Sequence, residues 1–169
     1  MDVTDRKIQL TRRIRVLLVV FMAGLVLAGL TAIPTRTELN ALARFMGASS
    51  TDTPQTTTGI LRWVVRVRNA LDDAYGKYPF LAYANDWLAF GHFVIALAFL
   101  GALRDPVRNV WVVEWGMMAC VAVVPMALIF GPLRDIPFYH QLVDCSFGVF
   151  GIIPLWLCRR SIGELETMI

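Results

Sequence analysis

Charged residues are scarce in this chain of 169 residues, and their scarcity is the first constraint on its fold. Aspartate, glutamate, lysine and arginine make up 17% of the residues, whereas soluble domains average about 25%. Hydrophobic residues reach 57%, and the mean hydropathy is +0.59. This balance argues against a small soluble domain and predicts an integral membrane protein.

Several motifs that carry chemistry in other proteins are missing. There is no HExxH zinc motif, no Walker loop for phosphate, no GxGxxG for dinucleotides and no GxSxG nucleophile motif. The cysteines Cys120, Cys145 and Cys158 form no CxxC pair and lie in or at the end of apolar runs, which makes a disulfide framework unexpected. No cofactor is expected, and nucleic-acid binding has no support beyond the basic ends.

Four apolar stretches approach the roughly 20 residues needed to cross about 30 Å of hydrocarbon. They cover about 16–33, 81–103, 110–130 and 137–158. The first follows a basic flank, but it is longer than the apolar core of a typical signal peptide, so we interpret it as an anchor helix. We predict an all-α membrane protein, a four-transmembrane-helix bundle that forms a single integral membrane domain over residues 1–169.

The distribution of arginines predicts the orientation of these spans. Basic residues precede the first span, separate the second from the third and follow the fourth, and an even number of spans puts them all on one side. They include Arg12, Arg13, Arg15, Arg104, Arg108, Arg159 and Arg160. Because basic flanks stay on the cytoplasmic side, we expect both termini there, in a bacterial-type inner membrane. Residues 34–80 then form an outer, periplasmic or extracytoplasmic, segment.

The outer segment 34–80 is expected to be partly helical. "TELNALARFMG" resembles a short amphipathic helix that stops at Gly47, and "ASSTDTPQTTTG" is polar and expected to be mobile. In "ILRWVVRVRNALDDAYGKY", Arg68–Asp72 and Asp73–Lys77 have the spacing of helical ion pairs. Apolar residues at helical spacing on this stretch are Ile60, Trp63, Val64, Val67, Leu71 and Tyr75. This helix either packs over the spans as a scaffold or binds a partner or lipid.

Five ionisable residues in or beside the spans are candidates for a functional site, because charges within a membrane are costly. They are Asp86, His92, Arg134, His140 and Asp144. At 1.5 Å per residue, Asp86, His140 and Asp144 lie about 5–10 Å from the outer side, and His92 lies about 16 Å deep. We therefore predict that Asp86, His140 and Asp144 share one outer polar layer, with Arg134 just above it. If this layer is a structural network, Arg134 pairs with Asp86 or Asp144.

Small residues predict which helix faces pack together. His140 and Asp144 share one helix face with Gly148 and Gly151, and Asn85, Ala89, His92 and Ala96 share another. The first span has Gly24, Ala28 and Ala32 at four-residue spacing. Stripes of polar and small residues of this kind face other helices rather than lipid.

Three interpretations of the polar layer stay open at this point. The layer is a structural network, or a ligand pocket open to the outer side that uses all five residues, or a metal site of Asp86, His140 and Asp144. The last would suit zinc or iron, yet no metal motif accompanies it. A haem shared by His92 and His140 is disfavoured, because their depths differ by about 11 Å.

The order of one span, a long outer segment and three closely spaced spans resembles that of the four-helix EXPERA membrane proteins, which include sterol isomerases and sterol-binding receptors. The resemblance is one of layout, and no functional residue of that family is carried over.

Two classes of function follow as hypotheses. The first is a protein that binds a lipid-like ligand or acts as an accessory to a partner complex, with membrane lipid, a protein partner or a second copy as its partner. The alternative is a membrane-embedded enzyme that acts on an amphiphilic substrate, with Asp86, His140 and Asp144 as catalytic candidates in acid–base or metal-assisted work.

Overall fold

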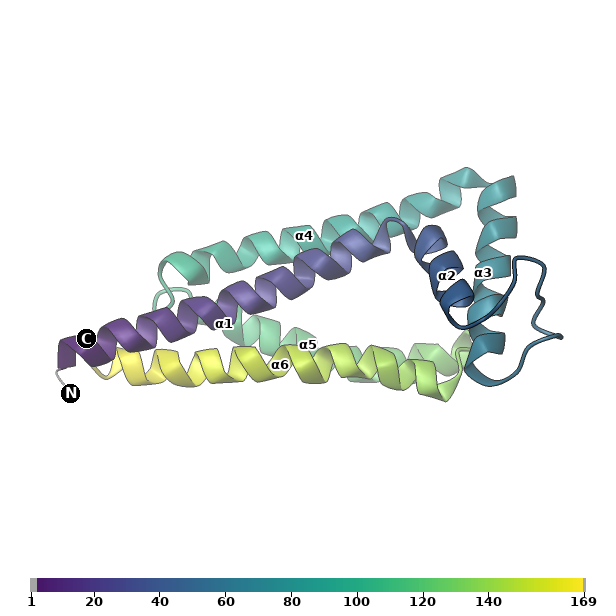
Figure 1. Ribbon diagram of the computed structural model, residues 1–169. Helices are drawn as coiled ribbons and strands as arrows, with labels where there is room; N and C mark the ends of the chain where they lie inside the picture. The colour runs from purple at the N-terminus through teal and green to yellow at the C-terminus, as the bar shows by residue number, and fades with distance from the viewer. Residues whose placement is uncertain (1–2, 169) are drawn as a thin grey trace. The chain divides into compact units, whose positions relative to one another are not determined.

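The computed structural model describes residues 3–168, and this part of the chain is helical with connecting turns. In chain order the helices are α1 Val3–Ala32, α2 Thr35–Phe45, α3 Gly59–Lys77, the 3-10 turn η1 Pro79–Ala82, α4 Tyr83–Arg104, α5 Val110–Leu133 and α6 Phe138–Glu166 (Figure 1). Four of them, α1, α4 with η1, α5 and α6, are long and apolar enough to cross a membrane. The predicted all-helical multi-pass fold, with helices between the first and second spans, is confirmed.

The two end helices are longer than the apolar runs within them. α1 has 30 residues and α6 has 29, which at 1.5 Å per residue makes each about 44 Å long. A hydrocarbon core of about 30 Å cannot contain that length without a large tilt. The basic start of α1 and the charged end of α6 therefore extend beyond the apolar runs predicted at 16–33 and 137–158.

The described residues divide into two compact units, each considered by itself. The first holds residues 3–25 and 94–168, and its core collects side chains from α1, α4, α5 and α6. Phe21 and Phe99 meet there with ring centroids 4.9 Å apart. The buried members of this core are Leu10, Ile14, Leu18, Phe99, Ala102, Val112, Val113, Cys120, Leu155, Cys158, Ile162 and Leu165.

Glycines let α5 and α6 pack closely as an antiparallel hairpin (Figure 1). A Cβ at Gly148 would press against the carbonyl oxygen of Cys120, and one at Gly151 would lie 2.9 Å from the Cys120 sulfur. A Cβ at Gly116 would lie 2.6 Å from the ring of Phe99. The predicted packing face of Gly148 and Gly151 is thus confirmed.

The second unit holds residues 26–93, and its core lies between α2 and α3. Ala43, Ala48, Val64 and Val65 are buried there. In the same unit, Gly29 packs against Phe93 and the carbonyl of Ala89. Gly24 was expected to belong to a packing stripe on α1, but a Cβ there would meet nothing within 4 Å, so that part of the prediction is wrong.

The close α5–α6 packing yields a test. Alanine normally stabilises a helix over glycine by about 0.5–1 kcal/mol, but forcing atoms into a packed contact costs about 1–3 kcal/mol. We expect Gly148→Ala to lower the thermal unfolding midpoint in detergent. The matched Gly24→Ala should leave the midpoint unchanged or raise it. A Gly148→Ala protein at least as stable as the parent would contradict the packing described here.

Candidate functional site

Asp86 lies in the first turn of α4, and its position has a local physical explanation. A negative charge there interacts favourably with the positive end of the helix dipole, typically by about 0.3–1 kcal/mol. Asp86 is exposed and, with Tyr83, Trp87 and Phe90, lines a surface hollow of about 240 Å³. The Trp87 ring meets the Tyr83 and Phe90 rings edge to face, at centroid distances of 5.9 and 5.5 Å.

His92 is satisfied within its own helix. Its Nδ1 lies 2.8 Å from the carbonyl oxygen of Leu88, one turn earlier, which requires a proton on Nδ1. This bond satisfies the polar imidazole within an apolar span, so it does not require a partner from another helix. His92 sits beside Ala89 and Ala96, which are 1% and 4% exposed, as the predicted stripe requires.

Arg134, His140 and Asp144 lie at or near the turn between α5 and α6, in the first unit. Nε2 of His140 is 3.9 Å from Oδ1 of Asp144, which is close enough for an ion pair but too long for a hydrogen bond. Arg134 ends α5 and is exposed. Of the two carboxylates predicted as partners of Arg134, Asp86 and Asp144, the second forms no ion pair with it in the part of the chain that the structure describes.

The five predicted site residues therefore fall into two groups. Asp86 and His92 belong to the second unit, and Arg134, His140 and Asp144 belong to the first. Within residues 3–168, no three histidine, cysteine, aspartate or glutamate side chains are placed to hold a metal ion. A single outer layer that couples Asp86, Arg134, His140 and Asp144 stays a prediction.

The turn between α5 and α6 is instead organised by Gln141, which sequence reasoning missed. Gln141 is 4% exposed, and its Nε2 donates to the carbonyl oxygen of Ile136 at 2.7 Å. Gly131 makes room for it, because a Cβ there would lie 2.6 Å from the Gln141 side chain. The signal in the sequence was a glutamine among apolar residues at a helix start, but its partner is a main-chain oxygen.

Asn85 is a second polar residue whose bonds could not be read from the sequence. Its Nδ2 donates to the Thr35 hydroxyl at 3.2 Å and to the Tyr75 hydroxyl at 3.1 Å. These bonds join the starts of α2 and α4 to the end of α3 within the second unit. The predicted role of Asn85 as a packing-face residue is confirmed, with residues of α2 and α3 as its partners.

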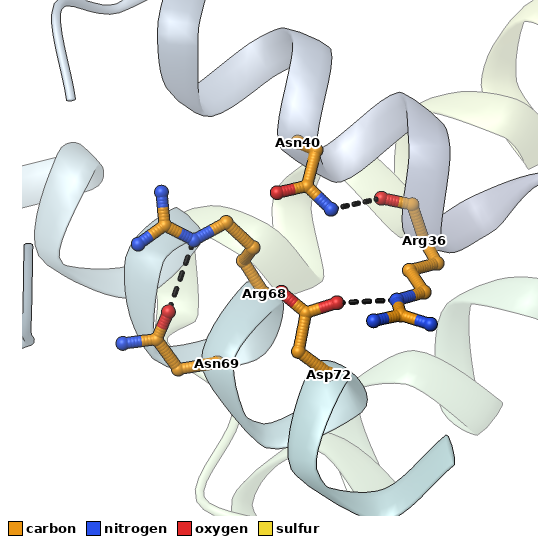
Figure 2. A network of polar contacts seen from close by, with 5 residues as sticks. All are labelled: Arg36, Asn40, Arg68, Asn69 and Asp72. Carbon is orange, nitrogen blue, oxygen red and sulfur yellow. Dashed lines mark hydrogen bonds and ion pairs between the residues drawn. The ribbon is translucent and has the colours of Figure 1, made fainter. Parts of the chain in front are cut away.

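Arg68, a buried residue of α3, connects this helix to the loop between α2 and α3. It is 3% exposed, and its Nη1 and Nη2 donate to the carbonyl oxygens of Ser49 and Asp52 at 2.9 and 3.0 Å. Its Nε donates to Oδ1 of Asn69 at 3.0 Å, a bond drawn in Figure 2. Each of the three guanidinium nitrogens therefore donates a hydrogen bond, which offsets part of the cost of burying the charge.

The predicted Arg68–Asp72 pair is wrong, because the two residues have other partners. Figure 2 shows Asp72 bonded to Nε of Arg36, which joins α2 to α3, while Asn40 donates to the main-chain oxygen of Arg36. Arg36 and Asp72 are half exposed, so this surface pair contributes only about 0–1 kcal/mol. The predicted Asp73–Lys77 pair is confirmed, at 2.8 Å.

The polar stretch at 48–59, which composition predicted to be mobile, is hydrogen-bonded throughout. The Ser49 N–H donates to Oδ2 of Asp52 at 2.8 Å, and the Thr57 hydroxyl donates to the Thr53 carbonyl at 3.1 Å. From α3, Nε of Arg62 donates to the Pro54 carbonyl at 2.7 Å. The serines and threonines replace missing helical bonds with side-chain bonds, which composition alone does not distinguish from disorder.

Two ion pairs join helices at the other end of the first unit. Arg6 and Glu164 meet at 2.8 Å between α1 and α6, and Arg159 and Glu114 meet at 2.7 Å between α6 and α5. Each side chain is between 37% and 47% exposed. Glu114, near the start of α5, thus has a defined basic partner.

Comparison with known proteins places this chain in no family: no protein-family model, no curated protein and no solved structure matches it. The resemblance to EXPERA proteins is therefore one of helix order alone. Function has to be argued from the residues described above.

The role of Arg68 can be tested by removing its guanidinium. Arg68→Met keeps the length of the side chain but removes the donor to the Ser49 carbonyl oxygen and one of the two donors to the Asp52 carbonyl oxygen, which also accepts from Asn69 Nδ2. A buried acceptor left unpaired costs about 1–3 kcal/mol. We expect subtilisin to cut residues 48–59 much faster in this variant, with the spans left intact. Arg66→Met, at an exposed position of the same helix, should be cut at the parent rate. Equal cleavage of the two variants would show that Arg68 does not hold the loop.

Proposed function

We propose that the protein is a multi-pass protein of a bacterial-type inner membrane whose function is to bind a lipid-like ligand or a partner complex. Its termini are cytoplasmic, and residues 34–80 form a folded outer docking unit. The basic flanks of the spans support this orientation. The observation that carries the proposed binding function is a second apolar face on α3.

This second apolar face of α3 consists of Ile60, Trp63, Val67 and Leu71, at helical spacing. The contacts of α3 with α2 and the loop use a different set of residues, Leu61, Val64, Val65 and Arg68. Ile60 is 58% exposed, and the other three members of the second face are half-buried. A helix that keeps an apolar face after packing its own unit is typical of an interaction surface.

The basic charge beside this face indicates what kind of surface it is. The guanidinium of Arg66 lies over the Trp63 ring, 5.9 Å from its centre. Exposed arginine and tryptophan side by side are enriched at binding sites and at membrane–water boundaries. An anionic amphiphile or an acidic helix of a partner would satisfy both the apolar and the basic groups.

The alternative hypothesis of a membrane-embedded enzyme has less support. Acid–base catalysis requires groups within hydrogen-bond reach of one another and of a substrate. His140 and Asp144 are 3.9 Å apart, and His92 is bonded to its own helix. Binding therefore explains more of the described contacts than catalysis does.

One labelling experiment tests orientation and binding together. Ile60→Cys is introduced into a Cys145→Ala background, since Cys120 and Cys158 are buried. A membrane-impermeant maleimide that carries a benzophenone is then applied to intact spheroplasts. We expect the probe to label Ile60→Cys from outside and, on illumination, to form one discrete adduct with a lipid or a single protein.

Two matched positions serve as controls. Glu166→Cys, at the end of α6, should react only after the membrane is permeabilised. Asp73→Cys, on α3 but outside the second apolar face, should be labelled yet give no discrete adduct. Labelling of Glu166→Cys from outside would reverse the orientation. Identical adducts from positions 60 and 73, or none from position 60, would refute binding at this face.

A further inference from the structure

The start of α1 carries basic side chains that the fold does not use. Arg6 is paired with Glu164, but Arg12, Arg13 and Arg15 are exposed and form no side-chain hydrogen bond or ion pair within residues 3–168. The core contacts of this stretch come from Leu10 and Ile14, on another side of the helix. The packing of α1 therefore does not explain why these three arginines are there.

Two surface hollows lie among these side chains. The first, of about 380 Å³, is lined by Gln9, Arg12, Arg13, Val16 and Leu17, together with Arg6 and Leu10. The second, of about 440 Å³, is lined by Lys7, Ile8, Arg12, Arg15 and Val16, together with Thr11. Arg12 and Val16 belong to both hollows. Each hollow therefore combines fixed positive charge with aliphatic surface.

The aliphatic surface continues along α1 away from the arginines. Val16, Val19 and Val20 are 55%, 51% and 58% exposed, and they begin the apolar run of the first span. At 1.5 Å per residue, Arg12 and Val20 are about 12 Å apart along the helix axis. A charged site that leads directly into an exposed apolar surface matches a molecule with an anionic head and a hydrocarbon tail.

We propose that the first turns of α1 bind the headgroup of an anionic phospholipid, with its acyl chains along Val16, Val19 and Val20. Basic residues beside a span attract anionic lipid. Free phosphate would satisfy the arginines but not the aliphatic lining, and nucleic acid would meet the apolar span. This site is distinct from the second apolar face of α3 and does not rest on the function proposed for it.

The test measures lipid binding to the purified full chain by native mass spectrometry in detergent. Phosphatidylglycerol is titrated against phosphatidylcholine with identical acyl chains, and the comparison is made for the parent and for Arg12→Gln/Arg13→Gln/Arg15→Gln. Each basic residue near a membrane surface contributes about fivefold in affinity, so the triple variant should bind phosphatidylglycerol roughly 100-fold more weakly. Phosphatidylcholine binding should be weak and unaffected.

Two further variants separate charge from folding and position. Arg12→Lys/Arg13→Lys/Arg15→Lys keeps the charges and should bind like the parent. Arg44→Gln/Arg104→Gln/Arg108→Gln removes three exposed arginines outside α1 and outside the second apolar face of α3, and it should keep phosphatidylglycerol binding at the start of α1. Inorganic phosphate at lipid-saturating concentration should not displace the lipid.

Several results would overturn the proposal. They are parent-like phosphatidylglycerol binding by the Arg12→Gln/Arg13→Gln/Arg15→Gln variant, an equal loss in the Arg44→Gln/Arg104→Gln/Arg108→Gln variant, or equal affinity of the parent for phosphatidylcholine. Displacement of the lipid by inorganic phosphate would assign the arginines to a soluble anion instead. Loss of binding in the lysine variant would show that charge is not what the site recognises.

Discussion

Hydrocarbon offers no hydrogen-bond partners, so polar groups in the four long helices have to be satisfied within the chain. The helices satisfy their own main chain, and His92 follows the same rule by donating to the Leu88 carbonyl. Nε2 of Gln141 donates a hydrogen bond to the main-chain carbonyl of Ile136. Asp86 stays at the start of α4, where the helix end favours a negative charge. Local satisfaction thus explains polar residues that, in sequence, resembled one site.

The free-energy cost of burying a charge also determines the contacts within residues 34–80. A buried arginine is costly unless it is hydrogen-bonded, and each guanidinium nitrogen of Arg68 donates to a partner: two main-chain carbonyls and Asn69. Its bonds close the loop between α2 and α3 and leave Asp72 for Arg36. Ile60, Trp63, Val67 and Leu71 lie outside the contacts of Arg68 and form the second apolar face of α3, on which the proposed binding function rests.

The parts of the fold that periodicity controls were predictable. Four runs of apolar residues gave four long helices, and the amphipathic stretches gave α2 and α3. Partner choice was not predictable, because it depends on three-dimensional proximity. Arg68 and Asp72 have ideal helical spacing yet bind elsewhere, and Gly24 has the spacing of a packing residue yet packs against nothing. Gln141 escaped notice, and the partners of Asn85 could not be predicted, because main-chain and hydroxyl partners leave no charge pattern in a sequence.

The central claim is that residues 34–80 are a folded unit rather than a tether between two spans. Hydrogen–deuterium exchange of the intact protein in lipid nanodiscs measures this most directly, because exchange reports the opening of each segment. The account predicts that peptides from α2, from the loop 48–58 and from α3 are protected together and lose protection in one common transition. Exchange of the loop at the rate of an unstructured peptide, with α2 and α3 opening independently of each other, would contradict it.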